Sequence, residues 1–584
     1  MSGWRRQAAM VMGMMMSMVL IGCKDMPRDL PASPAAQQSE SPAAKELTDE
    51  DFLKARDGRL FNRRGEPVVL RGTNLGGWLI QESWMCPVDK PDRGWGNWDT
   101  VNAFERRGFT EKQILRLFDT YQDSWITEKD LDRIQSMGMN CVRLPFWYRN
   151  FQKDDNGTYY GGDNMKKNPG FQRLDWLVEQ CAKRGIYVIF DLHGAPGFQS
   201  DDHSSGRTKA SELFENTESG ENYLLRTIEL WTRIAKRYRD NPAVAAYDLL
   251  NEPMNGFDDM RKADVRLWEL YDRIIRGIRK VDREHIISVE GVWELGNLPD
   301  PRHYGWTNML YQTHNYNRKP EEIDRKIRDI RDRVDWSVPV LVGEFQSEGI
   351  WDYALSSYNR EDVSWTTWTY KGAKSTLNDW FLYRNPSAEV IDPETDSYER
   401  ILEVWGSMQT ENGFVPDKDL AEVLEKYTDG HVDDSMGTFG WTHYEAENPL
   451  VATVFPAGQE TAFVGSEHYS AGKAVSGRNL SAPKEKGVPS DSSEIPHIAF
   501  TVQTEQAGKR GLRIVYDGER GKHKISVGVN EEAADTVWIN TDGPGKMCEQ
   551  ILEISLEKGA NIIRISGKSE GDTWNLDYIE VQNQ

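Results

Sequence analysis

Basic residues are scarce relative to acidic ones in this sequence of 584 residues. It contains 71 Lys and Arg against 93 Asp and Glu, which gives a formal net charge of −22 at pH 7. Nucleic-acid backbones bind to clusters of Lys and Arg, so this balance argues against a nucleic-acid partner. It suits a soluble protein with a neutral or cationic ligand. Tryptophan, in contrast, is abundant with 21 residues, which either fill a core or stack on flat apolar ligand surfaces.

Cysteine is also rare, with five residues in the whole chain. One is Cys23, and the spacing of the other four, Cys86, Cys141, Cys181 and Cys548, matches no metal-binding motif. Cys141 lies in a predicted strand and Cys181 in a predicted helix, so we expect both to be buried as small hydrophobic residues. An oxidising compartment would permit a disulfide, but the sequence does not require one.

Long apolar runs are absent except at the N-terminus. Residues 7–21 are apolar and uncharged, and they follow the positive segment Trp4-Arg5-Arg6. This run is too short to span a bilayer comfortably and is typical of a signal peptide. It ends in Leu-Ile-Gly-Cys, which resembles the bacterial lipobox, so we expect removal of residues 1–22 and lipidation of Cys23. A plain signal peptide is the alternative. The lipid would anchor the chain to a membrane of the cell envelope, facing the periplasm or the extracellular space.

The remaining chain divides by composition into a linker and two folded parts. Residues 23–50 are rich in Pro, Ala, Ser, Gln and Glu and predict a flexible tether. Residues 51–435 alternate short apolar strands with amphipathic helices, which predicts an α/β fold, a closed (β/α)8 TIM barrel. An open doubly wound sheet is the alternative. Residues 440–584 lack long helical patterns and predict an all-β antiparallel sandwich of jelly-roll type.

The expected elements follow the hydrophobic periodicity. The barrel strands are expected at 68–74, 141–146, 187–193, 243–251, 285–290, 309–316, 338–345 and 364–370. Helices are expected at 171–184, 224–239, 265–281 and 320–333. In the C-terminal part, strands are expected at 499–503, 511–516, 524–529 and 561–566.

Polar residues gather where the barrel strands end, and the carboxyl ends of the strands are where such barrels build active sites. Glu252 follows the fourth predicted strand and Glu344 ends the seventh. These two positions lie roughly opposite one another across a barrel mouth. Glycoside hydrolysis needs such a pair, because one carboxyl must protonate the leaving oxygen while the other must be ionised.

Six ordered motifs carry a family resemblance across residues 55–375. They are Arg71–Trp78, Asn140–Pro145, Leu250–Pro253, His314–Tyr316, Gly343–Phe345 and Trp365–Lys371. Together they resemble the motifs of glycoside hydrolase family 5. The resemblance implies that Glu252 is the acid/base and that Glu344 is the nucleophile. It also implies a substrate-binding shell made of Arg143, His193, Asn251, His314, Tyr316 and, under the −1 sugar, Trp368.

The chemistry of these side chains is consistent with the implied roles. Asn251 can hydrogen-bond the sugar 2-hydroxyl, a contact that strengthens in the transition state. Arg143 and Tyr316 can hold Glu344 ionised, whereas Glu252 has fewer cationic neighbours and can keep its proton closer to neutral pH. We therefore expect a carboxyl separation of about 5–5.5 Å and retention of configuration. This chemistry needs no metal or organic cofactor.

Within the family, Asn74–Ser83, Ser124–Asp130 and Asp191–Gly197 resemble the exo-β-1,3-glucanase branch. The resemblance implies that Glu82 contacts a terminal glucose and that the substrate is β-glucan, with β-1,3 and β-1,6 linkages. The sequence after Gly197 and the insertion Trp84–Thr110 depart from the branch. Endo-β-1,4-glucanase, β-mannanase, glucosylceramide hydrolase and transglycosylase activities therefore stay open, as does a non-catalytic surface glycan-binding lipoprotein. We expect a monomer.

The C-terminal part resembles carbohydrate-binding modules of families 6 and 35. In such modules two acids near the start and one near the end hold a structural Ca²⁺, which implies Glu445, Glu447 and Asp577 here. Trp574 and Asn575 lie where these modules often contact sugar, and a Trp face can stack on a ring. A buried structural Trp574, and a sandwich without sugar affinity, are the alternatives.

Overall fold

The computed structural model describes two folded parts of the chain. In the first it describes residues 46–90, 94–253, 265–334, 336–374 and 380–433. In the second it describes residues 441–446, 452–455, 463–465, 469, 473–480, 496–504, 506–530, 534–568 and 573–582. The predicted signal peptide, Cys23 and most of the predicted linker lie outside these ranges. Within them, no helix combines the length and the apolar character that crossing a bilayer requires.

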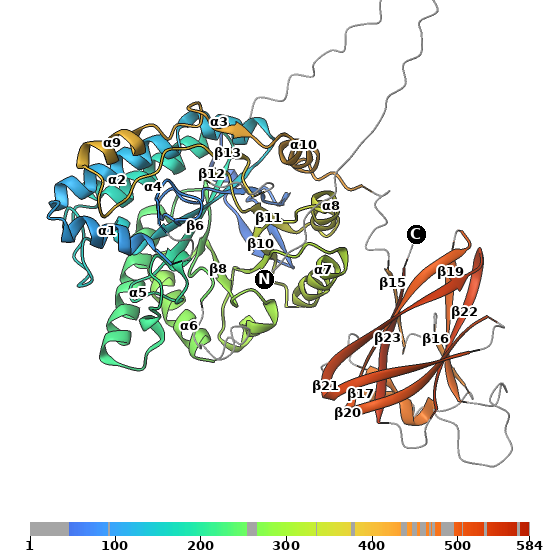
Figure 1. Cartoon of the computed structure of the whole chain (residues 1–584). Helices are drawn as coiled ribbons and strands as arrows, with labels where there is room; N and C mark the ends of the chain where they lie inside the picture. The colour runs from blue at the N-terminus through green and yellow to red at the C-terminus, as the bar shows by residue number, and fades with distance from the viewer. Residues whose placement is uncertain are drawn as a thin grey trace, which may run out of the picture. The chain divides into compact units, whose positions relative to one another are not determined.

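The first part is a closed barrel of eight parallel strands, as predicted from the sequence, and not an open sheet (Figure 1). Around the barrel the strand order is β10-β11-β4-β5-β6-β7-β8-β9. The strands are β4 (Arg71–Asn74), β5 (Cys141–Trp147), β6 (Tyr187–Gly194), β7 (Val244–Asp248), β8 (Ile286–Glu290), β9 (Met309–Asn315), β10 (Val340–Phe345) and β11 (Ser364–Thr367).

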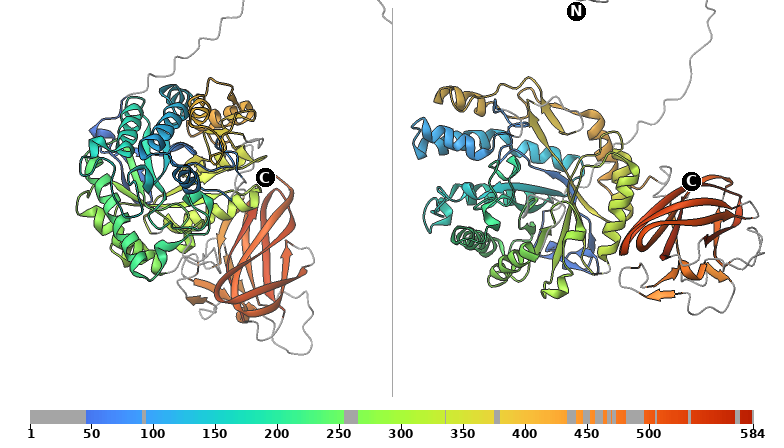
Figure 2. Two further views of the ribbon diagram at one scale, coloured as in Figure 1. Left: turned by 60° about the vertical axis from the view of Figure 1, so that its left-hand side comes forward. Right: turned by 60° about the horizontal axis from the view of Figure 1, so that its bottom comes forward.

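Helices form a ring outside the strands (Figure 2). They are α1 (Asn97–Arg106), α2 (Glu111–Trp125), α3 (Glu128–Ser136), α4 (Pro169–Ala182), α5 (Glu218–Tyr238), α6 (Val265–Arg279), α7 (Pro320–Val334), α8 (Trp351–Arg360), α9 (Tyr398–Gly406) and α10 (Lys418–Tyr427). The four predicted helices correspond to α4 to α7, with ends shifted by a few residues.

Helix α5 illustrates why these segments form and where they pack. Thr217 caps its N-terminus by accepting a hydrogen bond from the backbone of Gly220. Leu230, Trp231 and Ile234 are spaced so that they share one face, and all three are completely buried. Burying a large apolar side chain contributes roughly 1.5–3 kcal/mol, so this face fixes the helix against the barrel.

The amino ends of the barrel strands are closed by a separate apolar cluster. A small antiparallel sheet of β1 (Lys54–Arg56), β2 (Arg59–Phe61) and β3 (Pro67–Val68) supplies Leu60 to it. Cys141, Tyr187 and Ile286, each the first residue of a barrel strand, belong to the same cluster. The predicted strand 68–74 is thus divided between β3 and β4. With this end filled, the carboxyl ends of the strands remain to form a site.

A second small sheet flanks the barrel, with β12 (Lys371–Ala373), β13 (Tyr383–Asn385) and β14 (Val415–Pro416) in that order. Cys86, Cys141 and Cys181 are buried and unpaired, and Cys548 is unpaired and half-buried. The expectation that Cys141 and Cys181 act as buried hydrophobic residues is therefore confirmed.

The C-terminal part is an antiparallel all-β sandwich, as predicted. Its strands are β15 (Trp441–Glu445), β16 (Ala452–Phe455), β17 (Phe463–Gly465), β18 (Lys473–Ser476), β19 (His497–Thr504), β20 (Gly508–Val529), β21 (Asp535–Leu556), β22 (Gly559–Gly567) and β23 (Trp574–Gln582). The prediction of separate strands at 511–516 and 524–529 was wrong. Both belong to β20, which continues because its pairing with β21 shifts register around Gly518, where φ is +158°, instead of ending in a turn.

Candidate active site

Glu252 and Glu344 meet at the carboxyl edge of the barrel. Glu344 lies in β10 and Glu252 follows β7, and His314 of β9 lies between them. A carboxylate oxygen of each glutamate and a ring nitrogen of His314 all lie within 4.8 Å of one another. Retaining glycosidases place their carboxyl groups about 5–5.5 Å apart, whereas inverting enzymes leave about 6.5–9.5 Å for a water molecule. The approach of one oxygen of each glutamate to within 4.8 Å is compatible with the first arrangement.

Both oxygens of Glu344 are held by donors. Arg143 Nη1 lies 2.7 Å from Oε1, and the Tyr316 hydroxyl donates to Oε2 at 2.7 Å. Burial raises the pKa of Glu344 above its ordinary value, while the charge of Arg143 opposes this rise. Because a guanidinium contacts Glu344 directly and none from the described residues contacts Glu252, Glu344 is the carboxyl of the pair that is better stabilised as an anion.

Arg143, completely buried in β5, organises the floor of the site. Besides Glu344, its guanidinium contacts Asp248 at 2.9 Å and Asp191 at 3.2 Å. It also donates to the side-chain oxygens of Asn74 at 3.1 Å and Asn251 at 2.9 Å. A planar guanidinium with donors in fixed directions is well suited to hold several acceptors at once.

The contact with Arg143 also orients the amide of Asn251. Because Oδ1 accepts from Arg143 Nη2, Nδ2 must point away from the guanidinium. Nδ2 makes no hydrogen bond within the part of the chain that the structure describes. It is therefore a free donor beside the two glutamates, as the predicted contact with a sugar hydroxyl requires.

Glu252 has an environment unlike that of Glu344. Its Oε1 lies 2.7 Å from Trp293 Nε1, which donates to it, and 2.7 Å from His314 Nδ1. Burial raises the pKa of Glu252 to about 7, although the hydrogen bond from Trp293 lowers it. Burial also lowers the pKa of His314 to about 3, so its ring is neutral. Glu252 can therefore hold a proton near neutral pH, which is the property of a general acid.

The backbone of Glu252 is unusual as well, with φ at +41° in the left-handed region. Its amide nitrogen donates to Glu290 Oε2 at 2.7 Å. A non-glycine residue costs energy in this conformation and persists where its surroundings hold it, so Glu290 contributes to the position of Glu252.

Glu82 is the carboxylate of a second polar group in the same site. Trp84 Nε1 donates to its Oε2 at 2.8 Å, and His203 Nε2 lies 3.0 Å from the same oxygen. Although burial raises the pKa of Glu82, the contact with His203 brings it below the ordinary value. The charge of Glu82 also contributes to the raised pKa of Glu252.

Aromatic rings form the walls. The ring of Trp368, 4% exposed, stacks on His193 with 5.6 Å between ring centroids and 10° between planes. His193 Nδ1 lies 2.6 Å from Asp191 Oδ2, which fixes its orientation. Tyr316 stacks in the same way on Trp380, at 5.6 Å and 18°. The structure thus brings together every barrel residue that the sequence predicted for the site.

Trp293, Glu290, His203 and Trp380 were not predicted as site residues. Glu290 and Trp293 lie at the end of the fifth barrel strand and just after it, which is a position that the sequence could have indicated. His203 lies in the stretch noted only as a departure from the expected branch. Its role depends on a contact with Glu82, 121 positions away in the numbering, for which the sequence carries no local signal.

The cluster of Glu252, His314 and Glu344 has a composition that could hold a metal ion. However, Arg143 and Tyr316 already occupy both oxygens of Glu344, and a guanidinium at 2.7 Å disfavours a nearby cation. The arrangement suits acid–base chemistry by two carboxyls, which requires no cofactor.

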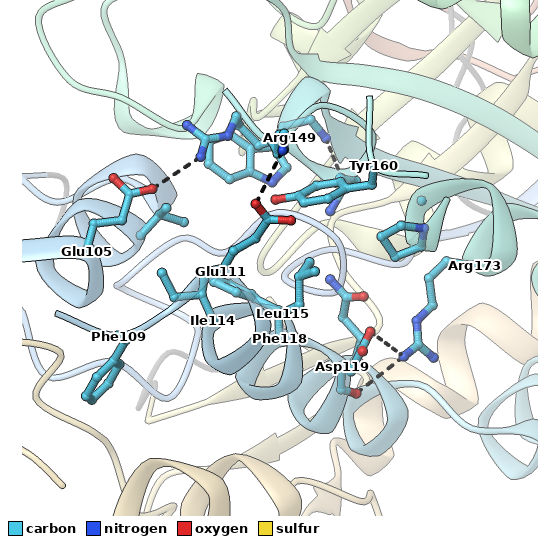
Figure 3. A pocket seen from close by; sticks show the side chains of 17 residues that line it. Glu105, Phe109, Glu111, Ile114, Leu115, Phe118, Asp119, Arg149, Tyr160 and Arg173 are labelled. Atoms are coloured by element: carbon cyan, nitrogen blue, oxygen red, sulfur yellow. Dashed lines mark hydrogen bonds and ion pairs between the residues drawn. The ribbon is translucent and has the colours of Figure 1, made fainter. Parts of the chain in front are cut away.

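A cavity of about 150 Å³ lies elsewhere on the barrel, lined by residues of α1, α2 and the segment after β5 (Figure 3). It contains Glu105 and Glu111, but both face cations. Arg149 lies 3.6 Å from Glu105, and Lys153 lies 3.6 Å from Glu111. These glutamates are ion-paired separately, so they do not form a second acid/base pair.

In the C-terminal sandwich, the prediction that Trp574 contacts sugar was wrong. Its side chain is completely buried in the core, so no ligand can reach the ring, and the structural alternative holds. The amide nitrogen of Asn575 is engaged internally with Tyr469 and Asp517. Asp577 is buried. Glu447 and the side chain of Glu445 lie outside the described residues, so the calcium site stays a prediction.

A parallel barrel with this carboxyl pair at its open end has the architecture of a glycoside hydrolase. Comparison with protein families supports this, because residues 97–381 match the family "Cellulase (glycosyl hydrolase family 5)". The barrel of this protein thus carries a glycosyl hydrolase family 5 domain, and the protein is a glycoside hydrolase.

Among curated proteins, the chain is 29% identical over 366 residues to a β-xylosidase of Phanerodontia chrysosporium, covering 55% of this chain and 71% of that protein. It is 24% identical to glucan 1,3-beta-glucosidase 1 of Schizosaccharomyces pombe, covering 55% and 81%. It is 32% identical to a glucan 1,3-beta-glucosidase of Blumeria graminis over 194 residues, which is only 42% of that protein's length.

Two solved structures resemble the chain weakly. An endogalactoceramidase matches over 91% of this chain and 100% of its own, with 14% identity and a TM-score of 0.45. A family 35 carbohydrate-binding module from Clostridium thermocellum matches over 24% of this chain and 98% of its own, with 21% identity and a TM-score of 0.20. At these scores neither match assigns a substrate or a module family.

Proposed function

We propose that this protein is a retaining exo-β-1,3-glucosidase that removes glucose from the non-reducing end of β-glucan. The observation that carries the proposal is Glu82, a buried carboxylate held by His203 and Trp84 beside the catalytic pair. Two relatives named as glucan 1,3-beta-glucosidases support the choice of linkage.

In the first step, Glu252 acts as the acid and Glu344 as the nucleophile. Glu252 Oε1 accepts from Trp293 Nε1 at 2.7 Å and lies 2.7 Å from His314 Nδ1, so the acidic proton is on Oε2 when Nδ1 is the donor. A Glu344 oxygen forms a bond to the anomeric carbon as the glycosidic C–O bond breaks. The leaving oxygen takes its electron pair from that bond and the proton from Glu252.

In the second step, Glu252 is ionised and acts as the base. It takes a proton from water while the water oxygen bonds to the anomeric carbon, and the ester bond to Glu344 breaks. Two inversions give glucose with the β configuration. The free Asn251 amide is positioned to donate to the 2-hydroxyl, and Arg143 stabilises the carboxylate that Glu344 becomes again.

Glu82 explains a preference for chain ends. Its Oε2 is occupied by Trp84 and His203, which leaves Oε1 to accept from sugar hydroxyls. A carboxylate can accept from two neighbouring hydroxyls such as the 3- and 4-hydroxyls, and the 3-hydroxyl of a β-1,3-glucan is free only on the terminal sugar. A sugar extended at that position could not donate to Oε1 and would leave a buried acceptor unsatisfied, which is costly.

β-Xylosidase activity is the second candidate, because a β-xylosidase is among the relatives. Xylose lacks the hydroxymethyl group of glucose, so it would lose the hydrogen bond that the 6-hydroxyl makes in the terminal-sugar site. Comparison of kcat/KM for aryl β-glucoside and aryl β-xyloside distinguishes the two. The proposal expects the glucoside to be preferred at least about tenfold, the effect of one hydrogen bond to a charged group.

We extend the proposal to the ends of the chain. Residues 1–22 would be removed as a lipoprotein signal peptide, and lipid on Cys23 would hold the enzyme at the cell envelope. The C-terminal sandwich would bind glycan. Metabolic labelling with a fatty acid tests the proposed lipidation. The wild-type protein should be labelled, and the Cys23→Ala variant should not. Retention of residues 440–584 fused to a carrier on insoluble glucan tests the proposed glycan binding, and no retention on any polysaccharide contradicts it.

Product analysis on β-1,3-, β-1,6- and β-1,4-glucans and on mannan tests the substrate. The expected result is glucose as the sole early product from β-1,3-glucan, absent with Glu344→Gln. Oligosaccharides from another polymer would keep the two-carboxyl chemistry but contradict the linkage and the role of Glu82. Long products from an end-blocked β-1,3-glucan would contradict exo action.

A further inference from the structure

Two buried polar atoms face each other beneath the catalytic pair, and each lacks a hydrogen bond. Oε1 of Glu290 and Nε2 of His314 lie 3.5 Å apart, and both side chains are completely buried. Neither atom has another partner in the part of the chain that the structure describes. Buried polar atoms are rarely left unsatisfied, so the two are suited to bond to each other.

The other atoms of both side chains are bound to Glu252. Glu290 Oε2 accepts from the backbone N–H of Glu252 at 2.7 Å, and His314 Nδ1 lies 2.7 Å from Glu252 Oε1. Glu290 itself is fixed at the end of β8, where Tyr271 donates its hydroxyl to the Glu290 carbonyl. Glu290 and His314 thus connect the backbone of Glu252 to its own carboxyl group.

The position of the single ring proton of His314 indicates which atom donates in a hydrogen bond between Glu290 Oε1 and His314 Nε2. Neutral His314 carries one ring proton. Because Glu252 Oε1 already accepts from Trp293 Nε1 at 2.7 Å, this oxygen is suited to accept from His314 Nδ1 as well, which places the ring proton on Nδ1. Nε2 is then an acceptor, so Glu290 Oε1 must be the donor and must carry a proton. The Glu290 surroundings agree, because burial and the charges of Glu252 and Asp248 raise its pKa well above the ordinary value, against the opposing effect of Arg143.

We propose that Glu290 is a positioning residue for the acid/base, which acts as a neutral carboxylic acid. Through Oε2 it holds the backbone of Glu252, and through the Oε1 proton it bonds His314 Nε2 and fixes the ring with its own proton on Nδ1. This inference rests on the proposed role of Glu252 as the acid.

The consequence of this arrangement is a defined place for the catalytic proton. With a proton on Nδ1, His314 donates to Glu252 Oε1 and leaves the acidic proton on Oε2, toward the leaving oxygen. With the other tautomer, His314 Nδ1 would accept that proton and draw it away from the leaving group. Glu290 therefore acts on proton transfer and not on substrate binding.

Two variants of Glu290 separate this role from others. Glu290→Gln keeps an acceptor for the Glu252 amide and an N–H donor for His314, so we expect kcat/KM on glucan within about threefold of the wild type. Glu290→Met has a similar volume but no donor or acceptor. We expect it to lower kcat/KM on glucan at least about tenfold, toward the lower range of general acid catalysis.

The dependence of activity on the leaving group distinguishes a role in proton transfer from a purely structural role. A dinitrophenyl β-glucoside leaves without protonation, so Glu290→Met should lose activity on glucan much more than on this donor, with KM nearly unchanged. Glu105→Gln, in the separate cavity, serves as the matched control. If Glu290→Met does not fold, the ¹⁵N shifts of His314 in the wild type decide, because the proposal requires a protonated Nδ1 and a bare Nε2.

Three results would overturn the proposal. These are a Glu290→Gln variant that loses as much activity as Glu290→Met, equal losses on both donors, or a proton on His314 Nε2. A wrong assignment of Glu252 as the acid can be distinguished from a wrong role for Glu290. If Glu252→Gln keeps its activity on glucan, the acid is misassigned, whatever the behaviour of Glu290.

Discussion

His203 Nε2 lies 3.0 Å from Glu82 Oε2, and both side chains are almost completely buried. The contact joins the loop after β6 to the segment after β4 and keeps a carboxylate charged inside the site. A buried charge persists only with a partner, so the two residues act as a unit. If Glu82 recognises a terminal sugar, then His203 is part of that recognition.

Substitution of Glu82 should therefore weaken the selection of chain ends. We expect Glu82→Gln to lower kcat/KM for exo cleavage of β-1,3-glucan by about tenfold to a hundredfold, because a hydrogen bond to a charged group contributes roughly 1.5–3 kcal/mol. The measurement is glucose release from reduced oligosaccharides. Glu111→Gln, in the separate cavity, is the matched control. A Glu82→Gln variant as active as this control would show that Glu82 does not contact substrate.

The same ion pair makes stability depend on pH. Although burial opposes it, contact with Asp202 and Glu82 raises the pKa of His203 to about 10, from an unfolded value of about 6.5. The stabilisation is thus fully present below about pH 6.5 and is lost as the pH rises through 10. Denaturant unfolding of the wild type at pH 6, 8 and 10 should show a free energy of unfolding that falls as the pH rises. The His203→Gln variant should lack this fall. Parallel declines in both proteins would contradict this.

The acid role of Glu252 predicts the basic limb of the pH profile. Its pKa of about 7 means that the protonated form is lost above neutral pH, so kcat/KM on glucan should fall there. Glu252→Gln should lower activity on glucan about 10²- to 10⁴-fold but spare formation of the glycosyl-enzyme from a dinitrophenyl glucoside. Added azide should then yield a β-glycosyl azide. An α-azide, or equal losses on both donors, would refute the assignment.

Arg143 should be required for folding as well as for chemistry. Arg143→Met leaves Asp191, Asp248 and Glu344 buried without their cation, and breaking a buried pair costs about 3–5 kcal/mol. We expect a fall of that size in the free energy of unfolding. Arg143→Lys should fold better but lose activity, because a point charge cannot hold several acceptors in place. An active Arg143→Lys enzyme would show that the charge alone suffices.

The sequence predicted the barrel and most of the site because both depend on local patterns. Each strand has its own hydrophobic signal, and the shared edge of a parallel barrel brings Arg143, Asn251 and Glu344 together. His203 was missed because its role depends on a tertiary contact with Glu82. The position of Glu290 at a strand end could have indicated a site residue, but its contacts with Glu252 and His314 are tertiary. Trp574 was misjudged because the pattern that suits a sugar-facing loop also suits the buried start of β23, and only the packed core distinguishes them.

Trapping of the glycosyl-enzyme tests the central proposal most directly. A 2-deoxy-2-fluoro-β-glucosyl donor with a good leaving group should inactivate the enzyme and add one sugar to it. Mass spectrometry of the digested protein should locate that sugar on Glu344, with no adduct in Glu344→Gln. An adduct on another residue, or turnover of the donor to α-fluoroglucose without any adduct, would contradict a retaining mechanism with Glu344 as the nucleophile.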